Sequence, residues 1–284
     1  MKEYLAITPA RDEEKFLPGL IASMTNQTCL PARWIIIDDG SSDASAALID
    51  QAAQNHRWIE PHHLPRNRKR APGGESVIMQ FLRRDLWERF DFILRVDADV
   101  SFNSTLVGSL IGEFAREQNL GIVSPVLLEP SPANWREVRN PHFHTRGPMK
   151  MYSRLCFAAI GGLEPGLGWD TVDETRAWML GFKTWSCPHL SAFHHRPQGA
   201  ASGMRHARIQ SGRAAYYSGY SPIFMIARAL RHSFRRRPAT GALMLAGYFQ
   251  GYLHRWPRLA SPELIRFVRR QQVRRLLRME SIWQ

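Results

Sequence analysis

The run Trp34-Ile35-Ile36-Ile37-Asp38-Asp39-Gly40-Ser41-Ser42-Asp43 decides the fold of this 284-residue chain. Its first four residues are apolar, and the apolar run stops abruptly on two aspartates. A short continuous apolar run of this kind is typical of a strand that is buried on both faces of a parallel sheet. Gly40 suits a tight turn, and Asp43 is expected to cap a helix that extends to Gln54.

A second run of the same kind follows at Phe92-Ile93-Leu94-Arg95-Val96-Asp97-Ala98-Asp99. A strand at Leu5–Thr8 and the helical pattern after it precede the first run, which gives a βαβα order. That order predicts an α/β fold, with a mainly parallel sheet flanked by helices and a right-handed crossover. Ligands of open α/β sheets bind beyond the carboxyl ends of the strands, where both acidic clusters are expected to lie.

The two acidic clusters indicate a site for a divalent cation that carries a diphosphate. Mg²⁺ and Mn²⁺ prefer oxygen ligands and are often held by one or two carboxylates together with substrate phosphates. Asp97 and Asp99 would point to the same side of a strand, so that both face a metal, or one binds metal and the other a ribose hydroxyl. Asp38 and Asp39 could accept hydrogen bonds from a base edge or a ribose. A turn or helix cap is the structural alternative for each cluster.

A third group of acids, Asp170, Asp173 and Glu174, follows the glycine-rich stretch that begins at Gly161. A helix is expected from Asp173 to Leu180, with Gly181 as its C-terminal glycine. Acids at a helix N-terminus often only complement the helix dipole. A carboxylate here could instead serve as the general base that takes a proton from an acceptor hydroxyl.

Two basic features could complete such a site. One imidazole of the pair His194-His195, preferably His195, could be a further metal ligand, although such a pair is also common as ordinary polar residues. The loop at 65–74 contains Arg66, Arg68, Lys69 and Arg70, and guanidinium groups suit phosphate oxygens. The alternative for this loop is a solvated surface segment.

Taken together, the motifs over residues 3–200 resemble the family 2 inverting glycosyltransferases, which have the GT-A fold. The resemblance rests on the order and spacing of four segments. They are Ile7–Arg11, Ile37–Asp43, Arg95–Asp99 and Gly168–Arg176 with Gly181.

The resemblance implies roles for individual residues. Thr8, Pro9 and Arg11 would border the nucleotide, and Asp39 would contact its base or ribose. Asp97 and Asp99 would hold the metal and the diphosphate. Counting back from Arg176 and Gly181 places Asp170 on the family's catalytic base, with Asp173 as the second choice. Trp169 stands where the family has a glutamate.

The implied reaction is a single displacement that moves one sugar from a nucleoside-diphosphate sugar to a hydroxyl acceptor, without a covalent intermediate. The Gln-x-x-Arg-Trp signature of processive members is absent, which indicates one sugar per encounter. The acceptor is expected to be a polyprenyl-linked glycan of a surface polysaccharide such as an exopolysaccharide. Two alternatives stay open: transfer to polyprenyl phosphate itself, and a sugar-nucleotide-binding protein without catalysis.

The net charge of +13 is concentrated in the last part of the chain. Residues 201–284 contain 16 arginines, no lysine and two acids, whereas acids and bases nearly balance before them. This asymmetry predicts a catalytic domain at 1–200 and a basic, amphipathic helical extension at 201–284. The extension is expected to lie on an anionic membrane surface. Packing on the catalytic domain or in a homo-oligomer is the alternative, and no nucleic-acid module is recognisable.

The remaining sequence features concern location. Cys29, Cys156 and Cys187 are odd in number and widely spaced, which favours a reducing cytoplasm over a disulfide framework. The N-terminus enters a strand-like run without a signal peptide, and no apolar stretch is long enough to span a bilayer. We therefore expect a cytoplasmic protein at the inner face of the plasma membrane.

Overall fold

The computed structural model describes residues 2–66, 75–132, 134–164, 168–196, 203–235, 238–259 and 261–282. The chain forms two compact units, each described here by itself. The first unit comprises Met1–Pro165 and Leu180–Pro197, and the second comprises Gly166–Met179 and Gln198–Gln284. The sequence places a boundary at residue 200, whereas this division also assigns the segment 166–179 to the C-terminal unit.

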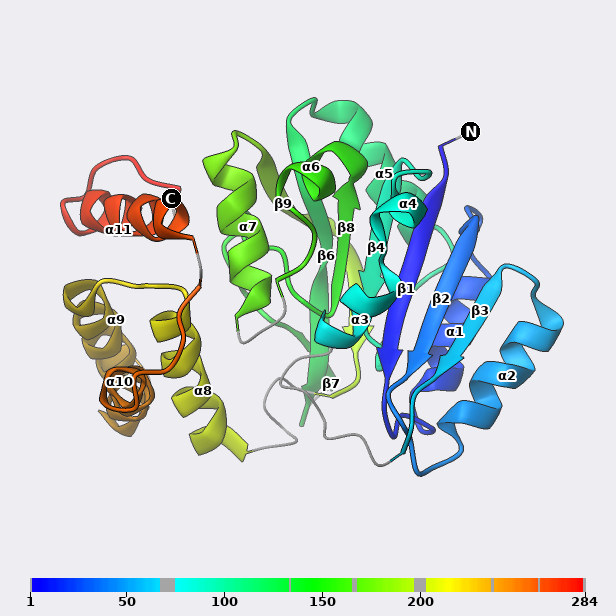
Figure 1. Cartoon of the computed structure of the whole chain (residues 1–284), viewed down its shortest axis with the longest axis horizontal. Coiled ribbons are helices and arrows are strands. Elements are labelled where there is room, and N and C mark those ends of the chain that lie inside the picture. Colours follow the sequence, from blue (N-terminus) through cyan, green and yellow to red (C-terminus); the bar gives the residue numbers. More distant parts are fainter. Residues whose placement is uncertain are drawn as a thin grey trace. The chain divides into compact units, whose positions relative to one another are not determined.

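Within the described residues, the first unit contains one sheet of nine strands in the order β3-β2-β1-β4-β8-β6-β9-β5, with β7 paired to β6 (Figure 1). The strands are β1 (Tyr4–Ala10), β2 (Arg33–Asp38), β3 (Ile59–His63), β4 (Phe92–Val96), β5 (Val100–Ser101), β6 (Leu120–Ser131), β7 (Asn134–Glu137), β8 (Met149–Ser153) and β9 (Lys183–His194). Strands β3, β2, β1 and β4 are all parallel. Strand β8 pairs antiparallel with both β4 and β6, and β6 pairs parallel with β9. The predicted α/β fold is confirmed.

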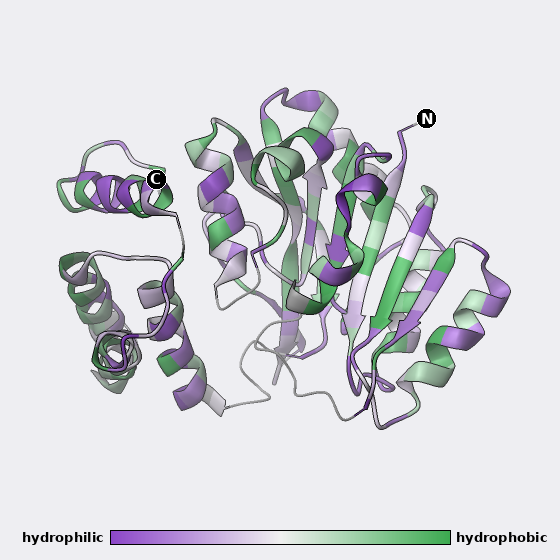
Figure 2. Ribbon diagram, viewed as in Figure 1, coloured by the Kyte–Doolittle hydropathy of each residue, from purple (hydrophilic) through white to green (hydrophobic). Residues whose placement is uncertain are grey.

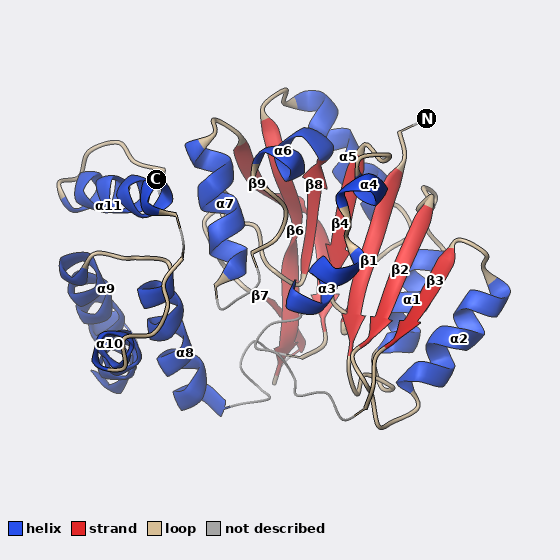
Figure 3. Cartoon of the chain, viewed as in Figure 1, coloured by secondary structure: helices blue, strands red, loops and turns tan. Residues whose placement is uncertain are grey.

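Both faces of the parallel strands are buried, as their continuous apolar sequences predict. Ala6, Ile36 and Leu94 belong to one core cluster with residues of the helices α1, α2 and α5. The intervening Leu5 and Ile35 are buried as well. Figure 3 shows helices in front of and behind these strands. The helices of this unit are α1 (Leu17–Thr25), α2 (Ser45–Asn55), α3 (Glu75–Phe81), α4 (Arg84–Trp87), α5 (Leu106–Arg116) and α6 (Arg154–Ala159).

Some local expectations differ from the structure. The N-cap of α2 is Ala44, while Asp43 accepts from the Ser45 backbone N–H at 2.9 Å. Strand β9 extends from Lys183 to His194, with a register shift against β6 after Pro125. The expected helix at 173–180 begins earlier, at Trp169, so Asp170 lies in its first turn.

The second unit is helical, and its described helices are α7 (Trp169–Met179), α8 (Gly203–Tyr217), α9 (Pro222–Arg235), α10 (Pro238–Leu253) and α11 (Pro262–Leu276). One core cluster contains Met225, Met244 and Tyr248, and another joins Val172 of α7 to Leu264 of α11. No helix in the described part of the chain is both long enough and apolar enough to cross a bilayer.

Glycines bring α8 and α10 very close together. A Cβ atom on Gly247 would lie 2.1 Å from the Ile209 carbonyl oxygen, and one on Gly212 would lie 2.0 Å from that of Met244. Backbone-to-backbone contact at these positions excludes any side chain. The glycines of this extension therefore specify a packed helical unit. Its last helix, α11, is rich in polar residues (Figure 2).

Candidate active site

The turns after β1 and β2 hold one another through side-chain caps. The Asp38 carboxylate accepts from the Ser41 backbone N–H at 2.8 Å. The Asp12 carboxylate accepts from the Ser42 N–H at 2.7 Å, and the Ser41 hydroxyl accepts from the Asp12 N–H at 3.0 Å. These short polar side chains satisfy the orphan backbone donors that two adjacent turns create. The polar run after Ile37 therefore builds a rigid rim at the carboxyl edge of the sheet.

Gly40 is required in this rim for two separate reasons. Its φ is +76°, in the left-handed region that favours glycine. A Cβ atom there would also lie 2.6 Å from the carbonyl oxygen of Pro65, in the loop after β3. The glycine therefore allows the loops after β2 and β3 to touch.

The residues that the sequence predicts to bind the nucleotide differ in their exposure. Thr8 is fully buried and its hydroxyl accepts from the Trp34 indole N–H at 3.0 Å, inside the sheet. Asp38 is also buried, committed to the turn and to the His63 ring at 3.3 Å. Arg11 and Asp39 lie at the rim, with guanidinium and carboxylate 3.7 Å apart. Pro9 is half-buried in β1. Arg70 lies outside the described residues.

Asp97 and Asp99 follow β4 at the same edge of the sheet. Arg95, buried in β4, pairs with the Asp97 carboxylate at 2.8 Å and donates to the Gly147 carbonyl oxygen at 2.5 Å. Burial raises the pKa of Asp97 above its usual range; the charge of Arg95 opposes the rise and the charge of Asp99 adds to it. Asp97 and Asp99 are therefore close enough for their charges to influence each other.

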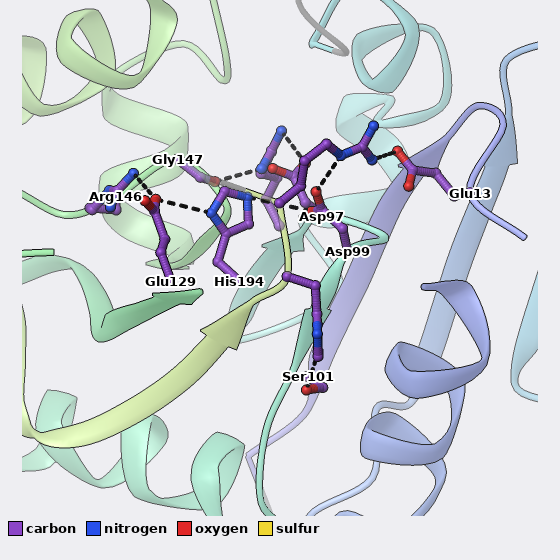
Figure 4. A network of polar contacts seen from close by, with 11 residues as sticks. Glu13, Asp97, Asp99, Ser101, Glu129, Arg146, Gly147 and His194 are labelled. Carbon is purple, nitrogen blue, oxygen red and sulfur yellow. Dashed lines mark hydrogen bonds and ion pairs between the residues drawn. The ribbon is translucent and has the colours of Figure 1, made fainter. Parts of the chain in front are cut away.

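A network of charged side chains surrounds Asp99 (Figure 4). Arg196 donates to Asp99 at 3.2 Å and also pairs with the buried Glu13. On the other side, the His194 ring lies 3.6 Å from Asp99 and 3.3 Å from Glu129, which in turn pairs with Arg146 at 3.1 Å. The network joins the turn after β1 to strands β6 and β9. It neutralises the acids of the site with bases from distant parts of the chain.

The ring of His195, the predicted metal ligand, contacts Ser101 and Phe16. Its Nε2 lies 2.7 Å from the Ser101 hydroxyl, and its ring stacks on Phe16 with centroids 5.8 Å apart. Burial lowers the pKa of the His195 ring, which favours its neutral form. The histidine beside Asp99 is His194, because successive side chains of a strand alternate in direction.

The two candidate bases belong to the second unit. Asp170 is partly exposed in the first turn of α7, where the helix dipole stabilises a carboxylate. Asp173 is buried, and its carboxylate accepts from the backbone N–H of Glu174 at 2.6 Å. Of the two, Asp170 is the side chain that can meet a substrate in solution.

The donor set at Asp97 and Asp99 fits a divalent cation of one particular kind. Both carboxylates are hard oxygen donors of the kind that Mg²⁺ and Mn²⁺ prefer. Among the described residues, no three His, Cys, Asp or Glu side chains converge to form a complete ligand set. A divalent cation held by these two carboxylates would need further ligands, such as phosphate oxygens and water.

The fold is that of GT-A glycosyltransferases, and comparison with known proteins shows the family. The model of glycosyl transferase family 2 matches residues 5–166, and the chain belongs to this family. No curated protein sequence matches the chain.

Solved structures show the same fold at low sequence identity. A mannosyltransferase from Pyrobaculum calidifontis, solved with GDP-Man and Mn²⁺, has a TM-score of 0.56 at 15% identity, covering 98% of this chain and 76% of its own. TarS 1–349 from S. aureus, solved with UDP-GlcNAc, gives 0.57 at 12% identity, with coverage of 91% and 93%. GalNAc-T7, solved with UDP, GalNAc and Mn²⁺, gives 0.62 at 13% identity, covering 99% of this chain and 55% of its own.

Four residues of the network were not named as site candidates from the sequence, namely Glu13, Glu129, Arg146 and Arg196, whereas His194 was named in the pair of which His195 was preferred. A usable signal existed for Arg196 and for choosing His194 over His195. Extending the strand pattern beyond Ser186 would have placed His194 and Arg196 on one side of the strand line and His195 on the other. The acids Glu13 and Glu129 carry no local signal, because their partners lie far away in sequence.

Proposed function

We propose that this family 2 glycosyltransferase is metal-dependent and inverting, and moves one sugar from a nucleoside-diphosphate sugar to a hydroxyl acceptor. The observation that carries the proposal is the pair Asp97 and Asp99 at the carboxyl edge of the sheet, beside the turn of Asp39 and Arg11. Structural relatives solved with Mn²⁺ and with GDP-Man, UDP-GlcNAc or UDP support the choice of donor class.

The binding chemistry follows from the side chains of the first unit. Asp39 would accept from a ribose hydroxyl or base edge, and Arg11 beside it would hold that carboxylate in place. Asp97 and Asp99 would hold Mn²⁺ or Mg²⁺, which supplies positive charge for the diphosphate when bound. Arg196 would offer its guanidinium to phosphate oxygens, because such planar donors match them well.

The proposed base is Asp170. An ionised carboxylate in the first turn of a helix can accept the proton of an acceptor hydroxyl as that hydroxyl attacks the anomeric carbon. One displacement inverts the anomeric centre, so no covalent sugar intermediate forms on the protein. We further propose a polyprenyl-linked glycan of surface polysaccharide synthesis as acceptor, at the inner face of the plasma membrane.

Calorimetric titration with UDP and GDP, with and without Mn²⁺, tests donor binding. We expect metal-dependent binding of one of them, and at least a tenfold loss in Asp99→Asn. Asp85→Asn, a matched change at an exposed aspartate of α4 paired with Arg83, should bind like the wild type. Metal-independent binding, or equal binding by both variants, would contradict the assignment.

A second variant separates an enzyme from a binding protein. Asp170→Asn should keep nucleotide binding and reduce transfer by about 100-fold or more, the range for loss of a general base. Transfer is followed as nucleoside diphosphate released from the donor in the presence of a lipid extract. Unchanged release in Asp170→Asn would show that Asp170 is not the base.

A further inference from the structure

One face of α9 exposes a row of large apolar side chains. Ile223, Ile226, Leu230 and Phe234 have exposed fractions of 71%, 42%, 53% and 88%. Their spacing of three or four residues places them on the same side of the helix. We refer to these four residues as the α9 stripe.

The packing of the second unit leaves the α9 stripe unexplained. Met225 and Ala229, on the opposite side of α9, are buried, and Met225 belongs to the core cluster of this unit. Single apolar residues are common on protein surfaces, but an aligned row of four indicates a surface that is covered in use. The α9 helix therefore has an inner apolar face that packs in the core of its unit and an outer apolar face that is available to a binding partner.

The positive charge around the α9 stripe indicates what kind of surface covers it. Arg231 is exposed on α9 beside the stripe, and α11 exposes Arg266 and Arg270. Residues 201–284 as a whole contain 16 arginines and two acids. An apolar stripe accompanied by arginines is the pattern of a helix that lies in the surface of an anionic bilayer.

The positive charge of residues 201–284 argues against a second copy of the chain as the occupant, and the apolar stripe argues against nucleic acid. A second copy of the chain would bring one strongly basic surface against another, and like charges oppose such an interface. Nucleic acid would use the arginines, but it offers no apolar partner for four aliphatic and aromatic side chains. Of these three occupants, an anionic lipid surface is the one that satisfies both the positive charge and the α9 stripe.

We propose that α9 lies in the surface of an anionic membrane, with the α9 stripe inserted at the boundary between headgroups and acyl chains. The neighbouring arginines then contact lipid phosphates. This mode requires no membrane-spanning helix. It rests on the membrane location given under the proposed function and assigns that location to the α9 stripe, which shares no residue with the donor site.

Vesicle sedimentation of the full chain tests the proposal. The probes are vesicles of phosphatidylcholine alone and vesicles in which about a third of the lipid is phosphatidylglycerol. We expect binding to the anionic vesicles, and at least tenfold weaker binding to the neutral ones. The double variant Leu230→Ser/Phe234→Ser should lose at least tenfold in binding to anionic vesicles. Leu155→Ser, at a residue 73% exposed on α6 of the first unit, is the matched control and should bind normally.

Three results would overturn the proposal: no binding of the wild type to anionic vesicles, unchanged binding by the double variant, or equal loss in the control. A change in oligomeric state on removing the stripe, seen by sedimentation velocity, would assign the face to a second copy instead. Phe234→Ser alone serves if the double variant misfolds, because that side chain makes almost no contact. Nucleotide titration of the same variants shows whether the donor site is intact. A loss of vesicle binding with normal nucleotide binding therefore concerns the α9 stripe alone.

Discussion

Replacing Gly40 by alanine should destabilise the first unit by about 2–5 kcal/mol. The left-handed φ of +76° costs a residue with a Cβ atom about 1–2 kcal/mol. The new methyl group would lie 2.6 Å from the Pro65 carbonyl oxygen and 3.0 Å from the Cα of Arg66. Both are backbone atoms, so relief requires a shift of the loop after β3, and overpacking of this kind costs about 1–3 kcal/mol more.

Two other glycines of the first unit distinguish the cost of the left-handed φ from the cost of the close contact. Gly161 has nearly the same φ, +77°, but no atom lies within 4 Å of its added Cβ. Gly161→Ala should therefore cost only the conformational term of about 1–2 kcal/mol. Gly112, inside α5, has ordinary helical φ and open space. Gly112→Ala should stabilise the unit by about 0.5–1 kcal/mol through helix propensity and the unfolded state.

The assay is urea unfolding of the three variants and the wild type, followed by tryptophan fluorescence. The expected order of midpoints is Gly112→Ala highest, then wild type, Gly161→Ala and Gly40→Ala, with unchanged slopes. Gly40→Ala should also weaken nucleotide binding, because Asp39 precedes the displaced turn, whereas Gly161→Ala should not. A Gly40→Ala protein as stable as Gly161→Ala would refute the close contact with Pro65.

Three further predictions concern buried contacts. Thr8→Val leaves the Trp34 indole N–H without its acceptor and should cost about 1–3 kcal/mol of unfolding free energy, while Thr8→Ser should cost less. Burial raises the pKa of Glu13 to about 7, against the charge of Arg196, so protonation of Glu13 favours the folded state. That stabilisation is full below the ordinary pKa of 4.5 and is lost as pH rises to about 7; Glu13→Gln should flatten the fall in stability between about pH 4.5 and pH 7, and an unchanged profile would exclude Glu13 as its source. Gly247→Ala should destabilise the second unit by about 1–3 kcal/mol, measured by circular dichroism on heating, and a wild-type melting curve would contradict the close helix crossing.

The parallel half of the sheet could be predicted because its signal is local. The runs ending at Asp38 and at Asp97 are apolar without interruption, and burial on both faces is the physical cause of that pattern. The position of the acids follows directly, since they come next in the chain. Gly40 was likewise predictable as a turn residue, although its contact with Pro65 was not.

The other half of the sheet could not be predicted in the same way. The long strand β9 is half-exposed, changes register against β6 and contains Pro188, so its sequence lacks a continuous strand pattern. Strand β7 is exposed along its length and depends on pairing with β6. The helical segment that begins at Glu75 is divided into α3 and α4. These outcomes depend on tertiary contacts that a local pattern does not contain.

The charges of the site also bear on the order of binding. Without ligands, Asp97 and Asp99 are neutralised by Arg95 and Arg196, and Glu13 shares the second of these guanidinium groups. A cation alone must compete with Arg196 for Asp99, and a diphosphate alone meets two carboxylates. Together they add little net charge, and Arg196 is free to turn from Asp99 to phosphate. Metal and nucleotide should therefore each strengthen the binding of the other, and by the same factor, since a coupling free energy between two ligands is reciprocal.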